Sequence, residues 1–335
     1  MTVKTKKLTL LTAAILAFVG CGGGGDADNN SNSSAAASDG QNSSRELRIA
    51  VMPTLDCLPI YIASETGIFS RESLSVALVP FTAHMDCDTA FAGGSVQIMP
   101  TDVVRAERLI HEGTPLHYVT TTGLGWQLLT AKTARIRKLE QLDDKMLAMT
   151  RYSATAMLSD QFVESAKLKP ERVFRIQVND VLVRLNMMET GTMDAMLLPE
   201  PQATVARKLG CNTLFDSTTD SLALGVIAFR IGDYKSPQAE PKDTLRRQQM
   251  ETFVKIYDEA CDSISIRGLD HYRNIITERC HVQPDIVDSL ILQHAPDFHH
   301  ATPPTQAAID RAKTWLGYLS VSKPKSESRK GRRRK

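Results

Sequence analysis

The chain has 335 residues, 42% of them apolar and 23% charged, which is enough for two packed lobes and ordinary for a globular protein. Its formal net charge is +2, but three lysines lie in the first seven residues and residues 323–335 carry a net charge of +7. The rest of the chain therefore has a net charge of −8, the opposite of the balance usual in a nucleic-acid-binding domain.

The first residues predict an export signal. The cationic segment MTVKTKK precedes an apolar run from Leu8 to Gly20, which is too short to span a membrane as a helix and ends at Cys21. A small residue followed by cysteine here resembles a bacterial lipoprotein signal, although Phe18 stands where leucine is usual. The resemblance implies acylation of Cys21 and a protein that is exported and lipid-anchored to the cell membrane, facing the periplasm. Ordinary signal cleavage is the alternative.

Two further segments have little to bury. Residues 22–45 are rich in Gly, Ser, Asn and Ala, so they are predicted to be a disordered tether with a reach of roughly 25–30 Å. Residues 321–335 are predicted to be a basic disordered tail. The alternative for this tail is a contact with an anionic surface such as lipid headgroups or nucleic acid.

From Leu47 the chain alternates β-rich runs with helical patterns, which predicts βαβ units and a mostly parallel sheet. The strands expected in the first half are 47–52, 75–81, 96–100 and 116–122, with helices at 59–69, near 87–94 and at 103–113. The rhythm then restarts, with strands at 126–131, 145–150, 173–178, 193–199 and 225–230 and helices at 153–166, 179–191 and 202–210. After residue 230 the pattern is almost purely helical, and its longest run covers 244–264.

One strand motif occurs twice. GSVQIMPTD from Gly94 and GTMDAMLLPE from Gly191 each run through an apolar stretch with one polar interruption to an acid, Asp102 or Glu200. Ligands of open α/β sheets bind beyond the carboxyl ends of the strands. The two acids are therefore predicted to face a cleft between two lobes.

These segments resemble periplasmic solute-binding proteins of the nitrate, sulfonate, taurine and pyrimidine-precursor group, which serve ABC importers. The resemblance starts near Leu47, reaches at least Arg230, and rests on three motifs. They are Ala63, Glu65, Gly67 and Phe69 at a helix end; Gly191, Asp194, Ala195, Glu200 and Pro201 along a strand; and Gly94, Thr101 and Asp102, with Gln97 where an acid is common.

The resemblance implies an α/β fold, a two-lobed periplasmic binding protein of type II with a hinged cleft and a helical C-terminal part. The expected hinge lies near residues 120–126 and 225–230. The expected divisions are a lipoprotein signal (1–21), the tether (22–45), lobe 1 (46–122 and 226–320), lobe 2 (123–225) and the tail (321–335).

The implied function is a substrate-binding lipoprotein of an ABC transporter that captures a small solute and delivers it to a membrane permease and its ATPase subunits. The expected protein is a monomer, not an enzyme, and needs no cofactor, metal or nucleic acid. The sequence contains no GxSxG elbow, Walker A loop or GxGxxG after its first strand. The alternatives are an enzyme of pyrimidine-precursor synthesis on the same fold, for which Cys57 and Cys87 form no cysteine-rich run, and a surface adhesin.

Two loops between a strand and a helix are candidate ligand contacts. In PTLDC, Thr54 and Asp56 follow the first strand, and the alternative is that Asp56 caps the next helix. In the second lobe, four residues precede or begin a helix whose N-terminus attracts anions, and capping by Ser153 is the alternative there. These residues are Arg151, Tyr152, Ser153 and Thr155.

Four more residues complete the predicted site: Asp86, Asp102, Glu200 and Trp126, with Trp126 offering a flat face for stacking. The alternatives are helix capping or pairing with Lys and Arg for the acids, and hinge packing for the tryptophan. Because four possible acids outnumber Arg151, the sequence leans toward an amino-pyrimidine-like nitrogen heterocycle over a sulfonate- or nitrate-type anion.

The chain also contains cysteines that could form disulfides and a cluster of metal-ligand residue types. Bridges Cys57–Cys87 and Cys261–Cys280 are open possibilities, Cys211 has no evident partner, and free thiols are equally compatible with the sequence. His84, Asp86, Cys87 and Asp88 are metal-ligand types but lack paired spacing, so no metal site is predicted.

Overall fold

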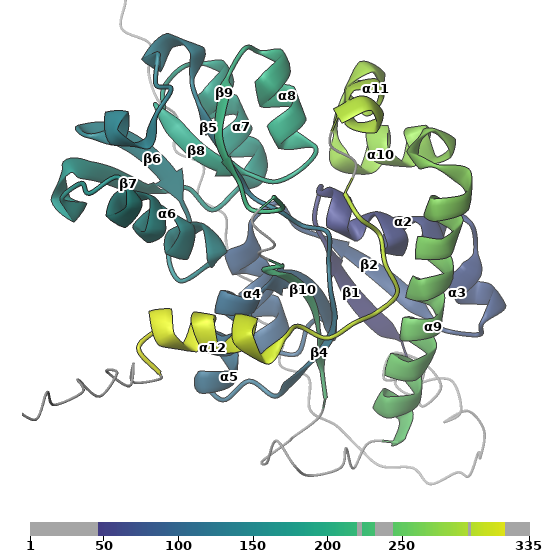
Figure 1. Cartoon of the computed structure of the whole chain (residues 1–335). Coiled ribbons are helices and arrows are strands. Elements are labelled where there is room, and N and C mark those ends of the chain that lie inside the picture. Colours follow the sequence, from purple (N-terminus) through teal and green to yellow (C-terminus); the bar gives the residue numbers. More distant parts are fainter. Residues whose placement is uncertain (1–45, 220–222, 232–243, 294–295, 319–335) are drawn as a thin grey trace, which may run out of the picture. The chain divides into compact units, whose positions relative to one another are not determined.

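Two five-stranded mixed sheets are present in the computed structural model, which describes residues 46–219, 223–231, 244–293 and 296–318 (Figure 1). The first sheet, in the order β2-β1-β3-β10-β4, contains β1 (Leu47–Val51), β2 (Val76–Pro80), β3 (Ile98–Asp102), β4 (Leu116–Thr121) and β10 (Gly225–Arg230). The second, in the order β7-β6-β8-β5-β9, contains β5 (Gln127–Thr130), β6 (Lys145–Met149), β7 (Val173–Gln177), β8 (Ala195–Leu198) and β9 (Asn212–Asp216). The expected two-lobed α/β fold is confirmed.

Helices follow the strands in each lobe. The first lobe, built on the first sheet, has η1 (Leu55–Cys57), α2 (Leu58–Glu65), α3 (Ile68–Arg71), α4 (His84–Ala92) and α5 (Val103–His111). The second lobe, built on the second sheet, has η2 (Lys132–Ala134), η3 (Leu139–Leu142), α6 (Ala154–Ser165), η4 (Pro170–Arg172), α7 (Val181–Glu189) and α8 (Gln202–Lys208). The C-terminal part has α9 (Thr244–Arg267), η5 (Leu269–Tyr272), α10 (Arg273–Cys280), α11 (Pro284–Gln293) and α12 (Gln306–Trp315).

Strand direction differs from the expected mostly parallel sheet. β1 pairs in parallel with β2 and β3, and β6 with β7 and β8, as βαβ units require. However, β10 is antiparallel to β3 and β4, and β5 is antiparallel to β8 and β9. The connections from β4 to β5 and from β9 to β10 are short and carry the chain from one sheet to the other, so each inserted strand runs against its neighbours.

The polar interruption in the repeated strand motif has one cause in both lobes. Gln97, just before β3, accepts a hydrogen bond through Oε1 from the backbone N–H of Arg48 (2.9 Å). Asp194, just before β8, accepts one through Oδ2 from the backbone N–H of Met146 (2.9 Å). Each side chain therefore satisfies a backbone donor of the neighbouring parallel strand.

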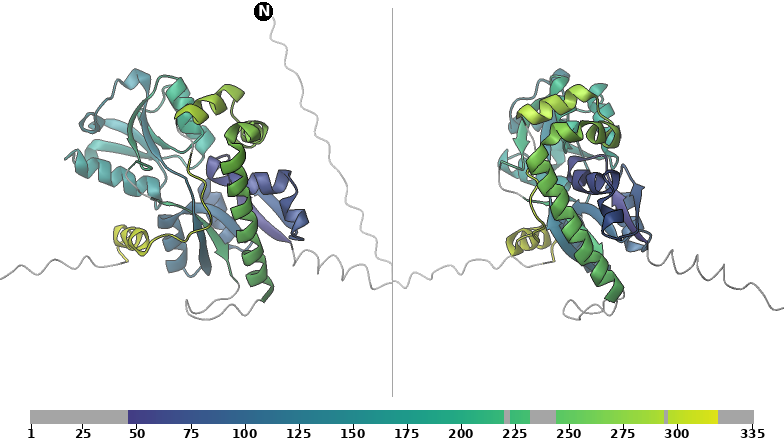
Figure 2. Two further views of the ribbon diagram at one scale, coloured as in Figure 1. Left: turned by 45° about the vertical axis from the view of Figure 1, so that its right-hand side comes forward. Right: turned by 90° about the vertical axis from the view of Figure 1, so that its right-hand side faces the viewer.

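Buried apolar clusters explain how the elements pack. One cluster joins the first sheet to α9 through Ile49, Phe229 and Phe253, and α9 packs against α2 (Figure 2). Another contains Val103 of α5 together with Leu128 of the second sheet, so it belongs to both lobes. Burial of such apolar area is the main stabilising contribution, at roughly 25 cal/mol per Å².

Several expectations concern residues outside the described ranges, namely the signal, Cys21, the tether and the basic tail. In the described part of the chain, no helix has the length and apolar character needed to cross a membrane. The five described cysteines are all unpaired, so neither Cys57–Cys87 nor Cys261–Cys280 is bridged.

Candidate functional site

The carboxyl ends of the parallel strands in the two lobes meet at a set of hydrogen bonds, which we call the seam. Each bond joins a residue that ends or follows a strand of the first sheet to one that follows a strand of the second. They are Leu55 N to Glu200 O (3.0 Å), Gln202 Nε2 to Pro53 O (2.6 Å), Ala154 N to Asp102 Oδ1 (3.0 Å) and Val181 N to Thr82 O (3.0 Å). The predicted residues buried at these strand ends are Thr54, Asp56, Asp102, Ser153, Thr155 and Glu200.

Asp102 lies at the centre of the seam. Its Oδ1 accepts the backbone N–H of Arg105 (2.9 Å), which caps α5, and the backbone N–H of Ala154 (3.0 Å) at the start of α6. The Arg105 guanidinium lies 3.4 Å from its Oδ2. Burial raises the pKa of Asp102 to about 6, and Arg105 opposes that rise. The carboxylate therefore joins the two lobes, and a role as ligand contact stays a prediction.

Glu200 is satisfied within the second lobe. Oε1 accepts hydrogen bonds from Gln127 Nε2 (2.9 Å) and Arg207 Nη2 (2.8 Å). Oε2 accepts from the backbone N–H (3.0 Å) and the hydroxyl (2.8 Å) of Thr204. Its charge is thus balanced by Arg207 of the same lobe, and a role of Glu200 as a ligand contact stays a prediction.

Asp56 is the acid that keeps both oxygens unengaged. It is 3% exposed, and neither its carboxylate oxygens nor the Thr54 hydroxyl has a hydrogen-bond partner among the described residues. It does not cap α2, whose N-cap residue is Cys57. Burial raises the pKa of Asp56 to about 6, because the charged form loses its hydration. The nearby Thr54 hydroxyl and the backbone N–H groups of Asp56 and Cys57 partly oppose this rise, although none of them makes a hydrogen bond of full geometry to the carboxylate.

Arg184 is a buried cation that the sequence analysis missed. It is 4% exposed and donates from Nε to Val178 O (2.7 Å), from Nη1 to Leu197 O (2.9 Å) and from Nη2 to Thr150 Oγ1. These acceptors lie at the carboxyl ends of β7, β8 and β6. No carboxylate of the described residues lies within ion-pair distance of it, and burial lowers the pKa of Arg184 to about 10.

Most of the charges near Arg184 are paired, and the Asp180 carboxylate at the start of α7 partly opposes the lowering of its pKa. The buried Asp88 and Asp102 neutralise Arg105 and Arg108 of α5. Burial, together with the nearby charges of Arg105 and Arg184, lowers the pKa of His84 well below its usual range, so this ring is neutral at pH 7. The guanidinium of Arg184 thus has an acidic neighbour in Asp180 but no carboxylate at ion-pair distance among the described residues. A buried charge of this kind is stable only with a partner.

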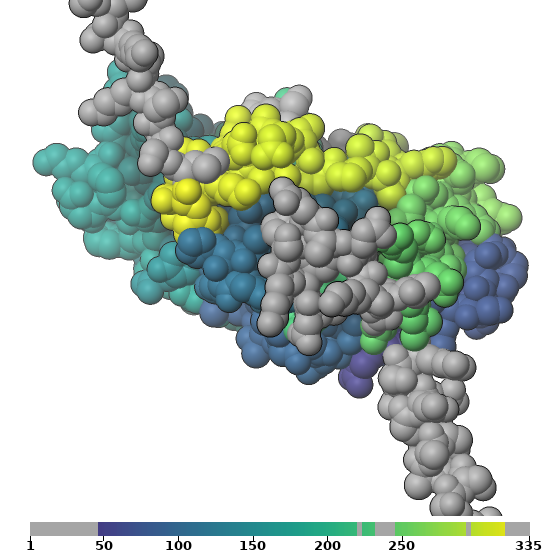
Figure 3. Space-filling view, turned by 90° about the horizontal axis from the view of Figure 1, so that it is seen from below, coloured from purple at the N-terminus to yellow at the C-terminus, as the bar shows by residue number. Residues whose placement is uncertain are grey.

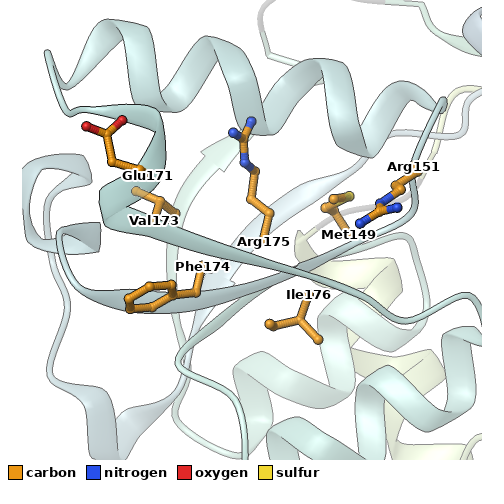
Figure 4. A pocket seen from close by; sticks show the side chains of 7 residues that line it. All are labelled: Met149, Arg151, Glu171, Val173, Phe174, Arg175 and Ile176. Atoms are coloured by element: carbon orange, nitrogen blue, oxygen red, sulfur yellow. The ribbon is translucent and has the colours of Figure 1, made fainter.

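The four predicted ligand contacts in the loop before α6 differ in burial: Ser153 and Thr155 are buried, whereas Arg151 and Tyr152 are exposed. Ser153 caps α6 by accepting from the backbone N–H of Thr155 (3.2 Å), and Thr155 Oγ1 accepts from the backbone N–H of Thr150 (2.9 Å). Tyr152 is 56% exposed and has a left-handed backbone (φ 53°). Arg151 is also exposed, at a cavity of about 500 Å³ beside Phe174 and Ile176 of the edge strand β7 (Figure 4).

Asp86 and Trp126 make none of the seam hydrogen bonds, although the cavity lined by Asp86 is also lined by Pro53 and Thr82 of the seam. Asp86 is exposed and lines a cavity of about 410 Å³ with Tyr61, Arg279 and His281, beyond the carboxyl ends of β1 and β2. Trp126 is buried in the apolar cluster shared by the lobes, and its backbone N–H donates to Ser217 Oγ (2.8 Å). The tryptophan therefore packs beside the crossover between the lobes, and stacking on a ligand remains untested.

The residues of metal-ligand type on α4 contact different partners and do not form a common site. Asp88 pairs with Arg105 and Arg108, whereas the Cys87 thiol is buried and donates to the Met52 sulfur (3.7 Å). Within the described ranges, no three His, Cys, Asp or Glu side chains are grouped as metal ligands.

One sequence signal points to Arg184. Val181, Arg184 and Met188 are the buried residues of α7, at spacings of three and four. An arginine within the apolar stripe of a helix is a rare arrangement, since arginine is seldom fully buried without a partner.

The fold and the sequence were compared with those of known proteins. No family model matches the sequence, and no curated protein matches it significantly. Among solved structures, the chain is similar to the alkanesulfonate-binding protein of Xanthomonas axonopodis pv. citri bound to MOPS (TM-score 0.65, 14% identity, covering 82% of this chain and 91% of that one).

The aliphatic sulphonate-binding protein of Escherichia coli gives a TM-score of 0.65 at 16% identity, with 82% of this chain and 91% of that one covered. The nitrate-binding protein of Synechocystis PCC 6803 gives 0.66 at 12% identity, with 83% of each chain covered. The chain therefore has the fold of type II periplasmic binding proteins, and the resemblance seen in the sequence is confirmed for the fold.

Proposed function

We propose that this protein is the solute-binding component of an ABC-type importer and captures a small anion of the sulfonate or nitrate kind between its lobes. The observation that carries the proposal is Arg184, a buried guanidinium beside the seam with no carboxylate at ion-pair distance among the described residues. An anion that enters between the lobes gives this guanidinium an ionic partner at close range. The fold shared with sulfonate- and nitrate-binding proteins supports the same solute class.

The preference for an anion reverses the weak lean drawn from the sequence. That lean counted Asp102 and Glu200 as free acids, yet Arg105 and Arg207 neutralise them. A nitrogen heterocycle with N–H donors remains the second candidate, because Asp56 and Thr54 have buried oxygens without partners in the described chain. The two candidates predict different essential residues, Arg184 for the anion and Asp56 for the heterocycle.

The rest of the proposal follows the resemblance. The chain is exported and held at the membrane through Cys21 and the tether, and lobes 46–122 with 226–320 and 123–225 close on the solute as a monomer. The closed form then delivers the solute to a permease with its ATPase subunits. An enzymatic role is disfavoured because burial raises the pKa of the Cys57 and Cys87 thiols, which keeps them protonated and poorly nucleophilic.

The test compares solute binding by the wild-type chain, Arg184→Gln and a control, Arg172→Gln. Arg172 is an exposed arginine of the second lobe that pairs with Asp143, so its loss leaves the seam intact. Calorimetry with ethanesulfonate, nitrate and an aminopyrimidine measures affinity, and native mass spectrometry identifies any co-purified solute. We expect Arg184→Gln to weaken anion binding about 10- to 100-fold, the value of a buried charge-assisted hydrogen bond, and the control to bind normally.

Anion binding that is unaffected by Arg184→Gln would refute the assignment. Binding of the aminopyrimidine alone, with loss of that binding in Asp56→Asn, would establish the second candidate. A chain that binds none of these compounds but converts one of them would establish the enzyme alternative.

A further inference from the structure

The last described segment, residues 296–318, runs along the connection between β4 and β5. Its C-terminal end contacts both lobes. We call this segment the strap. In Figure 3 it forms the yellow band that runs from the green C-terminal helices over blue first-lobe elements toward the teal second lobe. Its ordered end is α12, capped by Thr305, whose Oγ1 accepts from the backbone N–H of Ala308 (3.3 Å).

The first part of the strap is bound to the crossover that follows β4. The backbone N–H of Thr121 donates to Thr302 O (2.7 Å), and the backbone N–H of Thr302 donates to Thr120 Oγ1 (3.0 Å). A Cβ atom on Gly123 would lie 2.6 Å from Asp297 O, so the strap backbone lies directly against the crossover. The strap therefore covers one of the two connections about which the lobes would rotate.

Helix α12 then packs on the first lobe. Ala312 is fully buried in the apolar cluster that contains Val103 and Val104 of α5. Lys313 Nζ lies 3.4 Å from the buried carboxylate of Glu107, and the Tyr318 ring stacks on His111 with 3.9 Å between ring centroids. These contacts tie the strap to α5.

The same helix also reaches the second lobe. Trp315 Nε1 donates to Asp160 Oδ2 of α6 (2.9 Å), and Asp160 Oδ1 accepts from Arg175 of β7. The indole bond thus joins a helix anchored on the first lobe to a carboxylate held by a second-lobe arginine. Separation of α5 from α6 has to break this bond or pull α12 away from α5.

We propose that the strap acts as a latch, meaning that it stabilises the joined arrangement of the lobes relative to the open one. The Trp315–Asp160 hydrogen bond is the contact that holds the strap to the second lobe. The proposal goes beyond solute capture, because the latch shifts the balance between open and joined lobes before any solute binds. It rests on the lobe motion of the proposed function but not on the identity of the solute.

The test is hydrogen–deuterium exchange of the full chain without added solute. Trp315→Phe keeps an aromatic ring but removes the indole donor, and Asp160→Asn weakens the acceptor. The matched control is Gln306→Ala, since Gln306 is exposed on α12 and, among the described residues, bonds only to Asp310 of the same helix. The seam amides of Ala154 and Val181, which bond across the lobes, report opening.

Both latch variants should exchange these seam amides about fivefold faster than wild type, a shift typical of one lost hydrogen bond. Amides within β1 and β6 should be unchanged, and Gln306→Ala should match wild type. Seam exchange that is unchanged in either latch variant would overturn the proposal. So would an equal rise in the seam and in both sheets, because α12 would then stabilise the fold as a whole. No solute is present, so failure here is distinct from failure of anion binding.

Discussion

Asp56 and Arg184 are both charged side chains buried in apolar or weakly polar surroundings, and they respond differently to that burial. A carboxyl group can avoid the cost by taking up a proton, and its pKa of about 6 shows that it does so in mild acid. The guanidinium keeps its proton near neutral pH, and its hydrogen bonds go to carbonyl and hydroxyl acceptors, with the Asp180 carboxylate as a more distant negative charge. Arg184 is therefore the stronger indication of an ionic ligand.

Asp56→Asn should stabilise the protein at neutral pH. Because the folded-state pKa of about 6 lies above the unfolded value near 3.8, the folded state binds the proton more tightly. The wild-type free energy of unfolding therefore falls as the pH rises from about 4 to about 6. At pH 7.5 the variant should gain up to about 3 kcal/mol, the equivalent of two pKa units, and at pH 4 close to nothing. Urea unfolding at both pH values measures this.

Asp144→Asn is the control for that substitution, since Asp144 is exposed and should change stability by less than about 0.5 kcal/mol at either pH. Asp102 has a similarly raised pKa and stays in place, so part of the wild-type pH dependence should persist in Asp56→Asn. Destabilisation of Asp56→Asn at pH 7.5 would mean that the carboxylate has a favourable partner in the folded protein.

At the scale of elements, the hydrophobic pattern predicted most strands and helices. It did not predict the pairing of strands that are far apart in the sequence. The βαβ rhythm located β1 and α6, because alternation and capping residues are local signals. It did not reveal β9 or the antiparallel insertion of β10 between β3 and β4, which depends on chain segments about 100 residues apart. The candidate site shows the same division: acids at strand ends were visible, whereas their arginine partners were not.

The start of α7 should be more sensitive to loss of its cap than the start of α12. Asp180 Oδ1 accepts the backbone N–H groups of Leu182 (2.8 Å) and Val183 (2.9 Å), and Oδ2 accepts the Thr82 hydroxyl from the other lobe. Asp180→Ala removes the cap and this lobe-to-lobe bond, so we expect a loss of about 2 kcal/mol in the free energy of unfolding.

Thr305→Ala removes only a cap and should cost about 1 kcal/mol. Thr82→Val isolates the bond between the lobes, and its effect should largely disappear when Asp180 is already alanine. Equal costs for Asp180→Ala and Thr305→Ala would mean that the contact with Thr82 contributes nothing to stability.

At the scale of the whole molecule, the two lobes share one of their apolar clusters. Val104 of α5, Leu147 of β6 and Ala312 of α12 belong to the same buried set. Neither lobe can lose its packing there without exposing apolar surface of the other. We therefore expect a single cooperative unfolding transition, with tryptophan fluorescence, far-UV circular dichroism and calorimetry giving coincident midpoints. Two separated transitions would show that the lobes are independent in stability.

The position of β10 between β3 and β4 has a consequence for biosynthesis. The strands of the second sheet lie within residues 127–216, so that sheet can form as soon as this contiguous stretch is available. β4 has no neighbour in the first sheet until β10 arrives, about 100 residues later. The first lobe is thus the one completed later, and a chaperone that holds its early strands apart would prevent their aggregation while the second lobe folds.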